Sequence, residues 1–167
     1  MDITLNDITT TMEMHWTVWL ARLLAALILC GIIGFEREIG KRPAGLRTHM
    51  LTGLAAALYT LVMLHMTTAS VFDGEKVQTD PIRVIEAVTQ GVAFLAAGLV
   101  VFSQGNVLGL KTGATMWLCA AVGVCCALGL LSLAAVVTAI ALVTVVVLRI
   151  AEKKADTHCK GHASHDG

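Results

Sequence analysis

The chain has 167 residues, of which 56% are hydrophobic and only 14% are charged, and its mean hydropathy is +0.77. A soluble domain normally carries about a quarter charged residues. The composition therefore excludes an ordinary soluble protein and indicates an integral membrane protein. The formal net charge is zero. No basic patch with interleaved aromatic residues is present, which argues against nucleic-acid binding.

Five apolar runs follow one another, each close to the length that crosses a hydrocarbon core. We predict an all-α polytopic membrane protein with about five transmembrane helices, over 16–35, 48–71, 84–102, 112–131 and 133–150. The last two runs together exceed one span, so a break is placed near Gly129 and Ser132. Residues 1–15 form an extracytoplasmic segment, 16–150 the transmembrane domain, and 151–167 a cytoplasmic, disordered tail. The first fifteen residues contain no Lys or Arg, so no cleavable signal peptide is expected.

The connections between the runs are polar. Residues 34–49 carry six charges and a proline. The loop 72–81 ends in Asp80-Pro81, a helix-start signal with Asp as the cap and Pro in the first helical position. Residues 103–106 predict a short turn. Three glycines between 105 and 113 permit a tightly turned or re-entrant backbone before the fourth helix, which Thr112 could cap.

The basic residues predict the orientation, because cytoplasmic segments are enriched in Lys and Arg. With five spans and the N-terminus outside, two basic residues lie outside (Lys76 and Arg83), and Arg22 lies within the first span. The other nine lie inside: Arg37, Lys41, Arg42, Arg47, Lys111, Arg149, Lys153, Lys154 and Lys160. The predicted orientation is N-terminus outside and C-terminus cytoplasmic.

Arg22 is the basic residue placed inside a hydrophobic run, where an unpaired charge is unfavourable. We expect it to pair with Glu86 or Asp80, which lie at a similar depth. Snorkelling to the outer headgroups is the alternative. Arg83 and Glu86 are three residues apart and face each other on one helix. A cluster of these residues would either lock helices together or form an outward-facing polar pocket, and the sequence leaves both open.

Glu36 and Glu38 stand two apart at a helix end and therefore point to opposite sides. Carboxylates suit a hard cation such as magnesium, but the neighbouring Arg37, Arg42 and Arg47 favour an ion-paired rim instead. Small residues are dense in 91–98 and 113–123, which is typical of close helix packing in lipid. A polar groove lined by Gln90, Thr112 and Thr115 is the sharper alternative.

No metal or cofactor site is expected. The tail holds weak zinc or copper candidates without a second ligand pair at finger spacing, namely His158, Cys159, His162 and His165. Four of the five cysteines lie in apolar runs and are expected to act as packing residues. No nucleophile–base arrangement and no HExxH motif is present, so no enzyme is expected.

The motifs, in their order along the chain, resemble the MgtC/SapB family of bacterial inner-membrane proteins. The resemblance runs from about Arg22 to Leu131 and rests on Arg22 and five blocks: Gly34–Glu38, Arg42–His49, Asp80–Val84, Gly91–Gly98 and Gly109–Trp117. Departures from the family pattern occur at Ala93, Ala97, Lys111 and Gly113, which look like subgroup variation. The short stretch after Ile150 resembles the membrane-only branch, which lacks the soluble C-terminal domain of the virulence-associated members.

The resemblance implies a multi-pass bacterial inner-membrane protein linked to growth at low magnesium, acid resistance, virulence and stress response. It implies a small regulator that binds other inner-membrane proteins. We predict a candidate functional cluster of polar and charged residues, made up of Arg22, Glu36, Arg37, Glu38, Arg42, Arg47, Asp80, Arg83, Glu86, Thr112 and Thr115. The alternative is a cation transporter or channel for magnesium or protons, which with five helices would need an oligomer such as a homodimer.

Overall fold

A computed structural model describes residues 16–40, 42, 44–68, 81–103 and 106–162. Helix α2 spans Trp16–Ile39, α3 Leu46–Thr68, α4 Pro81–Leu99, α5 Leu110–Ala127 and α6 Leu131–His162. All five are long and apolar enough to cross a membrane. The prediction of an all-helical, multi-pass membrane protein is therefore confirmed.

A short hairpin interrupts the helices between α4 and α5. Strand β1 (Val101–Ser103) pairs antiparallel with β2 (Asn106–Leu108), with Val101 opposite Leu108. The sequence analysis expected only a turn at 103–106, and residues 104–105 lie outside the described part. Gly109 follows at φ 86° and is the residue before α5, so Thr112 is not its cap. A Cβ at Gly109 would collide with the Leu99 carbonyl oxygen, so the chain can return to α4 only through a glycine.

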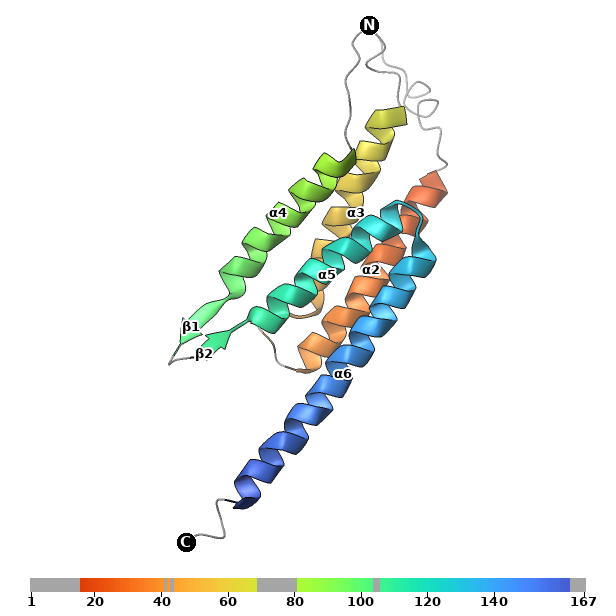
Figure 1. Ribbon diagram of the computed structural model, residues 1–167. Coiled ribbons are helices and arrows are strands. Elements are labelled where there is room, and N and C mark those ends of the chain that lie inside the picture. Colours follow the sequence, from red (N-terminus) through yellow and green to blue (C-terminus); the bar gives the residue numbers. More distant parts are fainter. Residues whose placement is uncertain (1–15, 41, 43, 69–80, 104–105, 163–167) are drawn as a thin grey trace, which may run out of the picture.

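Helix α5 lies at the centre of the bundle and contacts every other helix (Figure 1). On it pack α2 and α3, which also pack on each other, with α4 on one side and α6 on the other. Small buried residues fill the centre, including Cys30, Ala57, Cys119 and Cys126. The small side chains allow the backbones of α3 and α5 to approach closely. A Cβ at Gly123 on α5, for example, would collide with the Gly53 carbonyl oxygen on α3.

The break between α5 and α6 falls at Gly129, close to where the sequence placed it. Gly129 has φ 83°, its N–H donates to the Cys126 carbonyl at 3.0 Å, and the Leu130 N–H donates to the Cys125 carbonyl at 2.9 Å. This is the Schellman pattern, in which a left-handed glycine satisfies the last carbonyls of a helix. Glycine therefore turns α5 into α6.

Two helix boundaries bear on the predictions. Helix α4 begins at Pro81, as expected, while Asp80 lies outside the described residues. Helix α6 continues to His162, whereas the sequence analysis ended it at Ile150 and expected a disordered tail. The continuation contains Ala, Glu and Lys, which have high helix propensity. Residues 163–167 lie outside the described part.

The polar connections gather at two ends of the bundle (Figure 1). One end holds the α2–α3 connection, the hairpin and the C-terminal half of α6, and we call it the basic end because Arg37, Arg42, Arg47, Lys111 and Arg149 lie there. The opposite end holds the start of α2, the start of α4 and the α5–α6 turn.

Candidate functional site

Arg22 caps a helix rather than pairing with an acid. Its Nη1 donates a 2.6 Å hydrogen bond to the carbonyl oxygen of Ala127, the last residue of α5. The predicted partner Glu86 is exposed on α4, and no ion pair joins the two in the part of the chain that the structure describes. A cation at a helix C-terminus meets free carbonyls and the negative end of the helix dipole, which satisfies the buried charge without a carboxylate.

Glu36 is the centre of an ion-paired cluster at the basic end. Its carboxylate lies 3.6 Å from Arg37 Nε and 3.5 Å from Arg149 Nη1, and its side chain is 15% exposed. Of the ion-paired rim that the sequence analysis expected, the structure shows the pair between Glu36 and Arg37. Arg149 is a partner that the analysis did not name, because it lies more than a hundred residues away at the end of the last predicted span.

Glu38 has a different role from Glu36, whereas the sequence analysis placed both in one ion-paired rim. Its Oε2 accepts a 3.0 Å hydrogen bond from the Leu46 N–H, the first of α3. The carboxylate thus caps α3 from the end of α2 and fixes the angle between the two helices. Arg42 and Arg47, predicted as ion-pair partners here, are both exposed, and no ion pair to them occurs among the described residues.

His49 is a fully buried residue that the sequence analysis did not single out. Its Nδ1 lies 2.8 Å from the Gly45 carbonyl oxygen and its Nε2 lies 3.0 Å from Thr115 Oγ1 on α5. A carbonyl only accepts, so Nδ1 carries a proton, and in the neutral ring Nε2 accepts from the Thr115 hydroxyl. The Thr112 carbonyl oxygen lies 2.9 Å from the same hydroxyl and is a second acceptor for its single proton. The network joins α3 to α5 through polar groups.

The predicted groove of Gln90, Thr112 and Thr115 does not form. Thr112 and Thr115 are buried on α5, whereas Gln90 is exposed on α4. The reason is that α4 meets α5 through Ala96, which a Cβ at Gly113 would approach to 3.1 Å. Gln90 lies on the other side of α4.

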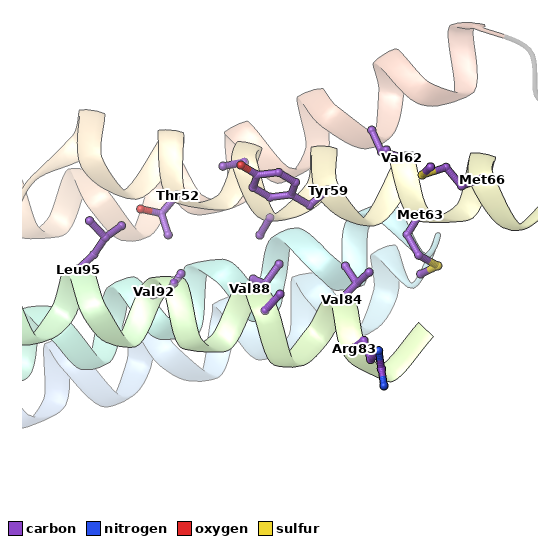
Figure 2. Close-up of a pocket in the computed structure, with 14 residues that line it drawn as sticks. Thr52, Tyr59, Val62, Met63, Met66, Arg83, Val84, Val88, Val92 and Leu95 are labelled. Carbon is purple, nitrogen blue, oxygen red and sulfur yellow. The ribbon is translucent and has the colours of Figure 1, made fainter. Parts of the chain in front are cut away.

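A large apolar groove separates α3 from α4 instead (Figure 2). Its volume is about 800 Å³, and its walls are mostly aliphatic and methionine side chains, with the Tyr59 hydroxyl as a polar group. Tyr59 is 64% exposed and lies near the middle of the Leu46–Thr67 span. Arg83 marks one end of the groove, with its side chain directed away from α3 (Figure 2).

The remaining predicted residues form no metal centre or polar pocket in the described region. No group of three His, Cys, Asp or Glu side chains that could hold a metal lies within it. Arg83 and Glu86 are exposed and form no ion pair with each other. The candidates His158, Cys159, His162 and His165 lie outside the residues whose side chains are described.

The helices and the polar ends define a small, multi-pass helical membrane protein. A family model described as the MgtC family matches residues 23–154, and the chain belongs to this family. The resemblance read from the sequence motifs is thereby confirmed.

Three relatives illustrate the match. YhiD of Escherichia coli (strain K12), whose name proposes a magnesium transporter, is 40% identical over 106 residues, which are 64% of this chain and 49% of YhiD. Protein MgtC of Brucella abortus (strain 2308) is 42% identical over 105 residues, 62% of this chain and 40% of that protein. An uncharacterized protein of Synechocystis is 37% identical over 110 residues, 66% of this chain and 43% of that protein. The match spans less than half the length of each relative. No solved structure matches.

Proposed function

We propose that the protein is a non-enzymatic regulator of the bacterial inner membrane that acts by binding other membrane proteins under magnesium limitation or acid stress. The observation that carries the proposal is the apolar groove between α3 and α4. Helix α4 is the least covered wall of the bundle, because Val92 is the one buried residue within Ile82–Leu99. A helix of a partner protein would cover it.

The α4 wall of the groove has the residue sizes that a second helix requires. Ala87 and Gly91 line it four residues apart, a small-xxx-small spacing that lets helix backbones approach closely in lipid. A Cβ at Gly91 would meet no described atom within 4 Å, so nothing in the described part of the subunit requires a glycine there. Glycine in a helix costs about 1 kcal/mol relative to alanine. A close external contact is a reason to keep it.

The basic end of the bundle is assigned to the cytoplasm, which leaves the N-terminus outside. The support is the excess of Lys and Arg at that end, nine against two in the sequence. The Arg83 end of the groove then lies at the outer surface. A reporter that is active only in the cytoplasm should be active when fused to the C-terminus, and a reporter that is active only outside the cytoplasm should be inactive there.

Cation transport is the second candidate, since the relative YhiD bears a name that proposes magnesium transport. Against it, the most buried acid of the basic end, Glu36, is already engaged by Arg37 and Arg149. Magnesium also demands a near-octahedral oxygen shell. Purified protein in vesicles loaded with a magnesium-sensitive dye should show no uptake above empty vesicles. If the vesicles take up magnesium and this uptake is lost in Glu36→Gln or Glu86→Gln, the protein is a transporter and the proposal of a regulator is wrong.

The groove itself is tested in cells by filling it. Gly91→Leu places a large side chain in the groove without touching the subunit's own packing, so the protein should remain inserted and abundant. Growth at low magnesium that depends on the gene should then be lost. The matched control is Ala139→Leu, at an exposed position of α6 outside the groove. Equal growth of both variants would argue against the groove as the working surface.

A further inference from the structure

The face of α4 that lies opposite the groove carries polar side chains that have no partner among the described residues. Gln90 lies at the middle of the Ile82–Leu99 span and is exposed, and Glu86 is exposed one turn nearer the start. Within the described residues, neither side chain makes a hydrogen bond or an ion pair. A bare amide at this depth would face the hydrocarbon of the bilayer.

Such an amide is unfavourable in lipid unless protein supplies a partner. Water cannot satisfy it at the middle of the bilayer, and the side chain is too short to reach a headgroup from there. The observation therefore points to a protein surface that covers this face of α4 in the membrane. The exposed hydrophobic residues of α2 and α6, by contrast, need only lipid.

The same face is built for close helix contact. Ala93 and Ala97 follow Gln90 at intervals of three and seven residues, so they share its side of the helix, and both are exposed. Together Glu86, Gln90, Ala93 and Ala97 form what we call the α4 stripe. Its small residues allow a second backbone to approach, and its amide supplies a hydrogen bond between the helices.

We propose that the α4 stripe is a homodimer interface, in which α4 packs on α4 of a second copy about a twofold axis along the membrane normal. The chemistry is self-complementary, because an amide both donates and accepts, so Gln90 can bond the partner subunit's Gln90. Arg83 and Glu86 carry opposite charges about one turn apart. The twofold axis places Arg83 beside the partner subunit's Glu86, and Figure 2 shows Arg83 directed away from α3 and toward the outside.

The centre of this interface lies outside the α3–α4 groove, although Arg83 also marks one end of the groove, and the interface does not depend on the proposed regulatory function. It uses Gln90 and Ala93, which do not line the groove. A dimer would leave both grooves open on its outer sides. Failure of the dimer would leave the groove proposal standing, and loss of groove function in Gly91→Leu should leave the dimer intact.

The first test measures association of the full chain in lipid vesicles. Energy transfer between differently labelled copies, followed while the protein is diluted into lipid, gives the dimer dissociation constant. Gln90→Leu should raise it roughly tenfold, equivalent to about 1.4 kcal/mol, and Gln90→Asn should largely restore association. Transfer no greater than random proximity in the unaltered protein, or an unchanged constant in Gln90→Leu, would overturn the proposal.

A second test locates the contact by disulfide formation in membranes. Ala93→Cys should cross-link on oxidation, in a Cys159→Ser background, since the other native cysteines are buried or half-buried. Ala139→Cys is the matched control, at an exposed alanine near the middle of the Leu131–Arg149 span of α6. Cross-linking at position 93 well above position 139 supports the α4 interface. Equal yields at both positions would overturn it, because random collisions would then explain the product.

Discussion

Arg22 on α2 donates a 2.6 Å hydrogen bond to the carbonyl oxygen of Ala127, where α5 ends. The guanidinium also lies against the α5–α6 turn, since a Cβ at Gly129 would approach its Nη2 to 3.0 Å. One side chain of the first helix thus fixes the end of the fourth membrane-spanning helix and the start of the fifth. The three helices therefore meet at this side chain, in addition to packing directly on one another.

Arg22→Ala should lower the free energy of unfolding by about 2 kcal/mol, because a hydrogen bond from a charged group is lost and a buried carbonyl is left unpaired. The protein should still insert, since the substitution makes the span more apolar. Unfolding in mixed micelles by detergent titration measures the change. Arg47→Ala is the control, as Arg47 is exposed and makes no ion pair among the described residues. If Arg22→Ala lowers the free energy of unfolding no more than the control does, Arg22 does not stabilise the protein by capping α5.

Gly129→Ala should destabilise the bundle by about 1–2 kcal/mol, because residue 129 has a positive φ and its new methyl group would press on Arg22. Gly98→Ala is the matched control: it lies in regular helix, and its Cβ would meet no atom within 4 Å. That variant should be neutral or more stable by a few tenths of a kcal/mol. Thermal unfolding of the two variants side by side measures the contrast. Equal melting temperatures would contradict the turn geometry.

Thr115→Val keeps the shape of the side chain but removes the hydroxyl that His49 Nε2 contacts at 3.0 Å. The buried ring nitrogen is left without a partner, which should cost about 1–3 kcal/mol of stability. Thr144→Val is the control, since the Thr144 hydroxyl is exposed and, among the described residues, bonds to the Ile140 carbonyl of its own helix. Native-state hydrogen exchange at the start of α3 should rise in the first variant and not in the second.

Glu38→Ala should lower stability by about 1 kcal/mol, because the first N–H of α3 loses the carboxylate that caps it. Glu86→Ala provides the comparison, since Glu86 is exposed and caps no helix. Detergent-titration unfolding of the monomeric protein, at high dilution, distinguishes the two. Salt should weaken the contribution of Glu38, as it is exposed. A Glu38→Ala variant as stable as Glu86→Ala would show that the cap contributes nothing measurable.

The number of helices and the place of the α5–α6 break could be predicted from the sequence, because span length and a glycine at a helix end are local signals. Helical periodicity also predicted that Glu36 and Glu38 point to different sides, but the cap that Glu38 forms on α3 was not predicted. The start of α4 at Pro81 was equally local. The hairpin at 101–108 was missed because its strands are only three residues long.

The partner of Arg22 could not be predicted in the same way. The sequence analysis expected an opposite charge at equal depth, whereas in the structure Arg22 bonds to the free carbonyls at the end of a helix. Backbone carbonyls are present in every residue, so no sequence signal distinguishes the ones that accept this bond. His49 was overlooked for a related reason: its partner Thr115 lies on another helix. The separation of Gln90 from Thr115 depends on how α4 rotates against α5, which Ala96 and Gly113 decide.

The central claim is that the α3–α4 groove binds a helix of another membrane protein. A photoreactive phenylalanine analogue at position 59, in the groove wall, tests it directly in the native membrane. Irradiation should yield a discrete adduct with one other membrane protein, and the adduct should disappear when Gly91→Leu fills the groove. The same analogue at the exposed position 140 of α6 should give no such adduct. Identical products from positions 59 and 140, or an adduct that survives Gly91→Leu, would contradict the account.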